Sequence, residues 1–201
     1  SDTYLDSHGD NDGTNSGSTL KDDIYGGYTP KIPRAVDNAP TARADTIGNG
    51  SASFDGSDDY ILLSSALSLS GAFTISAWVH PDIAINYITT LGEDSANNNW
   101  IRFTSATVAK FRIAGSDTGN WTSGLTLAYG GWQHLVFTRD GSNVLTMYLD
   151  GIAGGTTKTL SGTFAPTLIG MQDSSSWWNG KLDEVAVWDT SFSSNQVKTL
   201  Y

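Results

Sequence analysis

From residue 51 onward, apolar and polar residues alternate in short runs, which is the pattern of strands with one face toward a core. The segment FTISAWVHP (73–81) places apolar residues at its first, third, fifth and seventh positions. The segment WQHLVFTRDGSNVLTMYLDG (132–151) contains two such strands, and the turn-forming residues 140–143 lie between them. This pattern predicts antiparallel strands joined by tight turns.

Further short strands are predicted along the rest of this region. They flank the turn residues 55–59 and cover 87–91, 100–104, 110–113, 167–171 and 181–188. Near the end, Ser193 and Gln196 form a capping-box pattern ahead of Val197 and Leu200, which predicts one short C-terminal helix. About ten short strands, without a βαβ unit or a repeat, predict an all-β fold of two antiparallel sheets packed as a sandwich.

Residues 1–50 lack this alternation. The run 7–18 is polar, and Pro30, Pro33 and Pro40 follow it. We expect 1–50 to form an irregular N-terminal arm whose first strand completes the sandwich of residues 51–201, so that the chain is one domain overall. A linker from a longer polypeptide is the alternative interpretation of this segment.

The composition agrees with a strand-rich fold and excludes some functions. The chain has 19 Asp but only 2 Glu, and Asp favours turns where Glu favours helix surfaces. The formal net charge of −10 argues against a nucleic-acid partner, which requires a basic surface, and suits hard cations bound by carboxylates. No apolar run approaches the roughly 18–20 residues of a membrane helix, so we expect no membrane insertion.

Four blocks of the sequence carry a resemblance to a known family, and they cover 52–63, 73–81, 130–151 and 178–201. In this order and spacing they resemble the concanavalin A-like lectin/glucanase superfamily, most closely its laminin-G-like (pentraxin-type) domains of bacterial and phage surface proteins. The resemblance implies a jelly-roll β-sandwich and an extracellular, secreted or virion-surface location. Because relatives with this fold differ in function, it implies little about activity.

Catalysis is not expected. The glucanase relatives use a Glu-x-Asp-x-x-Glu run, and neither Glu93 nor Glu184 opens such a run here. A retaining glycosidase needs two carboxylates about 5–5.5 Å apart, but the same-face neighbours of Glu184 along its strand are Ala186 and Trp188. The three His residues lie far apart in the sequence, so no triad or zinc site is indicated.

The resemblance also implies a structural calcium ion, held where the N-terminal segment meets the last strand. The family-matched carboxylate is Asp183, and Asp6, Asp12 and the turn at Asp55 are expected to complete its oxygen shell. The alternative for Asp55 is ordinary turn chemistry, because Asp-Gly pairs commonly form turns.

Two surfaces are candidates for ligand binding. The first uses Trp121 and Trp177, which lie in polar turn sequence, and exposed Trp rings can stack on sugars. Alternatively, each ring folds back over the edge of the core.

The second surface follows from strand alternation. If the apolar residues of 100–104 and 110–113 face inward, then Trp100, Arg102 and Arg112 face outward. Two Arg residues beside a Trp could hold an acidic glycan through bidentate contacts. The alternative is an ordinary solvated face.

Together these observations favour a non-catalytic module that binds a polysaccharide or cell-surface glycan, with calcium expected as a structural ion. The alternative hypothesis is a virion or cell-surface structural domain, such as a phage capsid decoration or fibre component, which acts through contacts with other virion or surface proteins.

Overall fold

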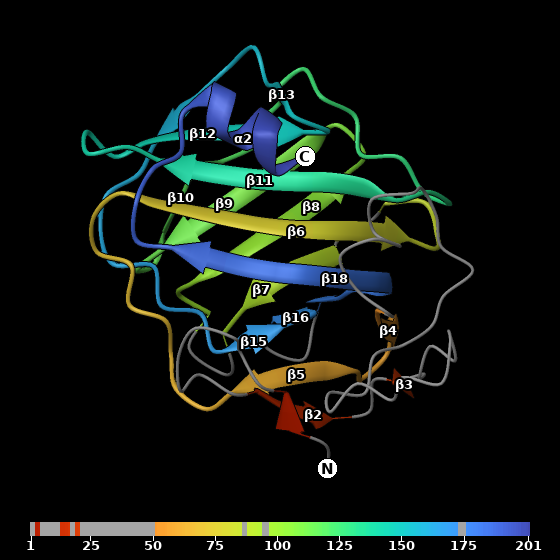
Figure 1. The fold of residues 1–201 in the computed structure, drawn as a ribbon. Coiled ribbons are helices and arrows are strands. Elements are labelled where there is room, and N and C mark those ends of the chain that lie inside the picture. The colour runs from red at the N-terminus through yellow and green to blue at the C-terminus, as the bar shows by residue number, and fades with distance from the viewer. Residues whose placement is uncertain are drawn as a thin grey trace.

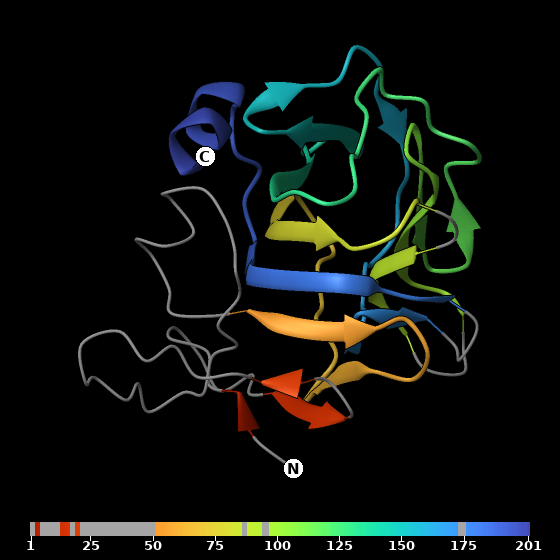
Figure 2. The same ribbon diagram turned by 90° about the vertical axis from the view of Figure 1, so that its right-hand side faces the viewer.

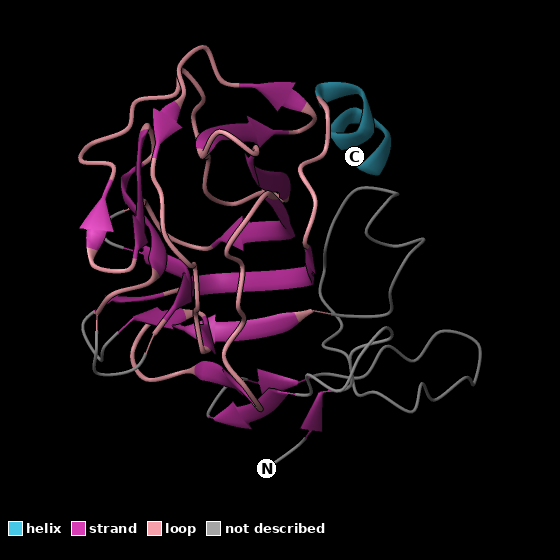
Figure 3. Cartoon of the chain, turned by 90° about the vertical axis from the view of Figure 1, so that its left-hand side faces the viewer, coloured by secondary structure: helices cyan, strands magenta, loops and turns pink. Residues whose placement is uncertain are grey.

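The computed structural model describes residues 3–4, 13–16, 19–20, 51–85, 88–93, 97–172 and 176–201. Two antiparallel sheets face each other across one core, which confirms the predicted jelly-roll sandwich (Figure 1). Figure 2 and Figure 3 show the two layers from opposite sides, with the C-terminal helix outside one of them.

Sheet A contains eight strands in spatial order. They are β1 (Thr3–Tyr4), β2 (Gly13–Ser16), β5 (Tyr60–Leu63), β15 (Leu168–Ile169), β7 (Ile88–Gly92), β8 (Trp100–Ser105), β9 (Val108–Ile113) and β10 (Ser116–Asp117). Beside β7, a separate hairpin is formed by β16 (Met171–Gln172) and β17 (Ser176–Trp177).

Sheet B is the second layer. Its strands in spatial order are β13 (Ile152–Ala153), β12 (Val144–Leu149), β11 (Gln133–Arg139), β6 (Phe73–Pro81), β18 (Asn179–Trp188), β4 (Ala52–Asp55) and β3 (Thr19–Leu20), and β14 (Lys158–Thr159) also pairs with β12. Only one helix, α2 (Ser194–Leu200), is found in the described part of the chain. No helix there is long and apolar enough to cross a membrane.

The predicted hairpin at 132–151 is confirmed as β11 and β12. Asp140 closes its turn, because one carboxylate oxygen accepts the backbone N–H groups of both Ser142 and Val144 at 2.8 Å. Asn143 adopts a φ of 63°, a left-handed conformation that Asn tolerates better than most residues. Local turn chemistry therefore sets the register of the two strands.

The core lies between the sheets and contains the apolar face of β6, as its alternation predicts. Sheet A contributes the inward residues of β8 and β9, which are Ile101, Phe103, Phe111 and Ile113. The Phe111 ring meets the Phe137 ring of sheet B edge-on, with centroids 5.6 Å apart. Such aromatic contacts join the two layers at the centre of the sandwich.

Helix α2 covers the outer face of sheet B. Ser193 and Gln196 form the predicted capping box, and Val197 packs against Val136 and Tyr148. Beyond the helix, the Tyr201 ring lies 6.0 Å from the ring of His134. His134 is buried and its Nε2 is 2.7 Å from the Ser76 hydroxyl, which agrees with the structural role expected for an isolated His.

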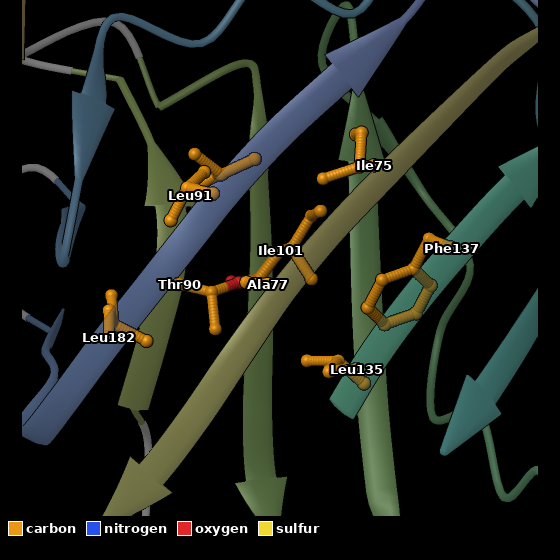
Figure 4. Close-up of a pocket in the computed structure, with 9 residues that line it drawn as sticks. Ile75, Ala77, Thr90, Leu91, Ile101, Leu135, Phe137 and Leu182 are labelled. Atoms are coloured by element: carbon orange, nitrogen blue, oxygen red, sulfur yellow. The ribbon is translucent and has the colours of Figure 1, made fainter. Parts of the chain in front are cut away.

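A β-bulge interrupts the pairing of β18 with β6 between Asp183 and Ala186, and Glu184 there has a φ of 49°. Beside the bulge, a small gap remains between the sheets, lined by Ala77, Val185 and mainly apolar neighbours (Figure 4). The gap has room for about one water molecule. The core therefore offers no cavity for an organic ligand.

Arg139, at the end of β11, is fully buried. Its guanidinium donates hydrogen bonds to the backbone carbonyls of Leu69, Gly71 and Gly162, and it lies 4.6 Å from the Phe73 ring centroid. Burial lowers the pKa of this side chain. No pattern in the sequence pointed to a buried cation here, because its partners are backbone atoms of distant loops.

Candidate functional site

A cationic patch lies on the outer face of sheet A, where β8 and β9 pair. Trp100 lies opposite Arg112 and Arg102 lies opposite Lys110, so the four side chains share one face. We call these four residues the β8–β9 patch. The inward residues of both strands are buried, so the predicted division of each strand into an inner and an outer face is confirmed.

Trp100 is the platform of this patch, but its ring is covered. The residue is only 2% exposed, and the Arg102 guanidinium lies 4.3 Å from the ring centroid. The indole Nε1–H donates to Asn97 Oδ1 at 2.7 Å. The prediction that the Trp100 ring is open to a ligand is therefore wrong, because the cation expected beside the ring lies over it.

Gln172 holds Arg102 in this position. Its Oε1 accepts a hydrogen bond from Arg102 Nη1 at 3.3 Å, and its Nε2 donates to Asn97 Oδ1 at 2.7 Å. Trp100, Asn97, Gln172 and Arg102 thus form a closed polar ring. Sequence reasoning missed Gln172 and Asn97, because Arg102 and Gln172 are 70 positions apart and the sequence carries no signal of this contact.

Glu93 and Asn99 fix the loop that precedes β8. Glu93 Oε2 accepts the Asn98 backbone N–H at 2.9 Å and the Asn99 side-chain amide at 3.1 Å. The Asn99 Oδ1 in turn accepts the Ala114 backbone N–H at 3.2 Å. The Glu93 carboxylate therefore stabilises the loop that precedes β8.

Arg112 differs from Arg102 in its surroundings. Its guanidinium lies 5.9 Å from the Trp100 ring centroid, and its buried Nε has no hydrogen-bond partner among the described residues. Asp117 lies opposite it on β10, but the Asp117 carboxylate accepts the Gly119 backbone N–H at 2.7 Å. Because Nε is enclosed, only the outer Nη groups of the half-buried Arg112 can contact a ligand at this face.

Trp121 is buried in the core, so the prediction that it forms an exposed sugar-stacking ring is wrong. Its backbone forms two hydrogen bonds with Ala109, which draws this segment onto the edge of β9. The indole lies 6.0 Å from the Phe137 ring and donates to the Thr156 carbonyl at 3.2 Å. The alternative interpretation, a ring folded back over the core edge, describes what the structure shows.

Trp177 is half-buried and lies opposite Met171 in the β16–β17 hairpin. The hairpin's other pair, Gln172 and Ser176, points to the opposite face, because neighbouring residues of a strand alternate. Trp177 therefore lies on the hairpin face opposite to Gln172 and its contact with Arg102. It shares no surface with Trp121, because Trp121 is buried. The buried indole Nε1 of Trp177 has no partner among the residues that the structure describes.

Two of the predicted calcium ligands, Asp183 and Asp55, do not come together. Asn179 of β18 lies opposite Asp55, so Asp183 is four residues further along, or about 13 Å. The Asp183 carboxylate accepts the neighbouring Glu184 N–H at 2.8 Å. A shared shell of Asp183 and the Asp55 turn is thus wrong, and Asp6 and Asp12 lie outside the described residues.

Three other carboxylates do meet. Ligand atoms of Asp55, Asp58 and Asp59 all lie within 4.8 Å of one another in the turn between β4 and β5. Burial raises the pKa of Asp59, the Asp55 N–H opposes this by donating to its Oδ2 at 2.9 Å, and the other two carboxylates raise it further. These oxygens fit the ligand chemistry of a hard cation such as calcium, and calcium binding stays a prediction.

The two antiparallel sheets packed face to face define a jelly-roll β-sandwich domain. The chain belongs to the concanavalin A-like lectin/glucanases superfamily, whose laminin-G sequence model matches residues 55–198. No curated protein sequence matches the chain.

Solved structures show the same fold at low identity. Domain 4 of AbnA, an extracellular GH43 arabinanase of Geobacillus stearothermophilus crystallised with arabinotriose, is 19% identical with a TM-score of 0.61, over 91% of this chain and 87% of that one. A heptameric SAP-like pentraxin of Limulus polyphemus is 18% identical with a TM-score of 0.57, over 74% and 79%.

A botulinum neurotoxin type C structure, described by its interaction with two ganglioside molecules, is 15% identical with a TM-score of 0.52. The match covers 91% of this chain and 50% of that one. The fold therefore occurs in a pentraxin and in a neurotoxin, and also as a domain of an enzyme.

Proposed function

We propose that this protein is a non-catalytic glycan-binding module and that the β8–β9 patch is its binding surface. The observation that carries the proposal is the ordered polar ring around Trp100, which holds Arg102 in place beside the exposed side of Arg112. Ordered donors on a sheet face suit recognition of a polar ligand. The arabinotriose and ganglioside complexes of structural neighbours support glycans as the ligand class.

A binding role, as opposed to catalysis, is supported by the chemistry of the patch. Its neighbouring carboxylates, Glu93 and Asp117, each accept backbone N–H groups and serve loop structure. We infer an extracellular or virion-surface location for such a module.

A structural role at a virion or cell surface, through protein–protein contacts, is the second candidate. It is supported by exposed apolar residues at one end of the sandwich, where Tyr129 and Ile83 are 63% and 48% exposed. The Gly130 N–H donates to the Pro81 carbonyl at 2.8 Å, which ties their two loops together. Exposed apolar groups of this kind often mark protein contacts.

A glycan array tests the proposed function, with wild type compared to Gln172→Ala. Loss of Gln172 removes the hydrogen bonds that hold Arg102 and Asn97, so we expect about tenfold weaker binding to any glycan that wild type retains. Thr199→Ala, on the outside of α2, is the control and is expected to bind as wild type does. An array without any bound glycan would contradict the proposal and favour the structural role.

A further inference from the structure

Positive charge is concentrated on one face of an otherwise acidic chain. The full sequence carries a net charge of −10, and only seven Lys and Arg residues follow residue 50. Three of these seven, Arg102, Lys110 and Arg112, lie side by side on β8 and β9. The local charge of the patch is thus opposite in sign to that of the whole molecule.

Several acceptor atoms beside the β8–β9 patch already accept hydrogen bonds. Asn97 Oδ1 accepts two hydrogen bonds, Gln172 Oε1 accepts one from Arg102, and Glu93 Oε2 accepts two from the loop. What remains at this face is the donor capacity of the Arg112 Nη groups and of the Lys110 ammonium, since both residues are half-buried on β9. A neutral sugar hydroxyl both donates and accepts, whereas a carboxylate or sulfate only accepts. The patch therefore matches an anionic group better than a hydroxyl.

The two Arg residues have different tasks in this arrangement. Arg102 is held by the Trp100 ring and by Gln172, and it fixes the shape of the patch. The guanidinium of Arg112 is half-buried, is further from the ring, and forms no ion pair with any residue that the structure describes. A guanidinium presents parallel N–H groups that fit the two oxygens of a carboxylate or sulfate.

We propose that the β8–β9 patch binds a sugar that carries a negatively charged group, with Arg112 as the residue that contacts this group. Arg102 is a positioning residue, and Lys110 adds charge beside it. The inference rests on the proposed glycan-binding function and specifies the ligand class of the same site.

The test measures binding of three soluble polysaccharides by isothermal titration calorimetry: neutral dextran, polygalacturonate as the carboxylate, and dextran sulfate. Wild type is expected to bind at least one of the anionic polymers and to bind dextran more weakly. Arg112→Gln is expected to weaken anionic binding by about ten- to a hundredfold, the range for a charged hydrogen-bonded contact.

Two further variants separate geometry from bulk charge. Arg112→Lys keeps the charge and loses the two-pronged contact, so it is expected to restore only part of the affinity. Lys158→Gln makes the same change of charge on β14 of sheet B, far along the chain from the patch, and is expected to change affinity less than twofold. Circular dichroism melting curves verify that each variant folds.

The outcomes distinguish this inference from the proposed function. Selective loss of carboxylate or sulfate binding in Arg112→Gln supports the inference and identifies the group. Binding of dextran as tight as that of both anions, or equal losses in Arg112→Gln and Lys158→Gln, overturns the inference and leaves glycan binding in place. Failure to bind any polymer, together with a silent glycan array, contradicts both.

Discussion

At the scale of single residues, Arg139 and Arg112 show two uses of the same side chain. Arg139 is fully enclosed and its donors are matched by carbonyls of Leu69, Gly71 and Gly162. Arg112 lies half-buried on the outer face of sheet A, and its enclosed Nε has no hydrogen-bond partner among the described residues. A buried cation that is fully hydrogen-bonded stabilises the loops around it, whereas an unmatched one at a surface is available to a ligand.

Replacement of Arg139 is expected to destabilise the fold strongly. Arg139→Met keeps most of the volume but removes the guanidinium donors of the Leu69, Gly71 and Gly162 carbonyls, of which Leu69 retains the Phe164 N–H, so we expect a loss of about 2–5 kcal/mol in the free energy of unfolding. Urea titration followed by tryptophan fluorescence measures it. Lys158→Met, near the surface of sheet B, serves as the control. A loss below about 0.5 kcal/mol in Arg139→Met would contradict the stabilising role of the buried guanidinium.

At the scale of elements, the turn between β4 and β5 carries a concentration of negative charge that the two flanking strands do not require. Asp55 and Asp59 cap this turn through backbone N–H groups, and Asp58 lies beside them. Asn179 of β18 adds a hydrogen bond from its amide to the Asp55 carbonyl at 2.8 Å. The turn is thus held by hydrogen bonds from backbone N–H and amide groups, while its three carboxylates repel one another.

The raised pKa of Asp59 gives the stability a defined pH dependence. Asp59 retains its proton to higher pH when folded, so its contribution is complete below the unfolded pKa of about 3.9 and is lost as pH rises through the folded pKa. Asp59→Asn should therefore melt at a higher temperature than wild type at pH 7. This difference should shrink as pH falls toward about 4. Asp140→Asn, in an exposed turn, should bring no such gain.

Calcium is expected to remove this repulsion. If the ion binds Asp55, Asp58 and Asp59, the melting temperature of wild type rises with calcium, and about 2.7 kcal/mol is gained at a concentration 100-fold above Kd. Asp58→Asn should lose the rise and Asp183→Asn should keep it, measured by scanning calorimetry with and without EGTA. A wild-type protein that melts identically in calcium and in EGTA would rule out the ion here.

At the scale of the whole molecule, features set by residues close together in the sequence could be predicted. Features set by contacts between distant segments could not. Alternation within 73–81 assigned the inner face of β6, and local turn residues placed the β11–β12 hairpin. The burial of Trp121 could not be predicted, because its polar local sequence does not indicate the backbone hydrogen bonds with Ala109 that place it in the core. The separation of Asp183 from Asp55 depends on strand register, which neither residue's neighbours encode.

The position of α2 has a practical consequence for handling the protein. The helix lies on the outer face of sheet B and the β8–β9 patch on the outer face of sheet A, so the C-terminal residue and the patch are on opposite sides of the sandwich (Figure 2). Attachment to a sensor surface through Tyr201 would leave the patch facing the solution. Random coupling through amines would instead modify Lys110 within the patch, and would mask the binding that such an assay is meant to detect.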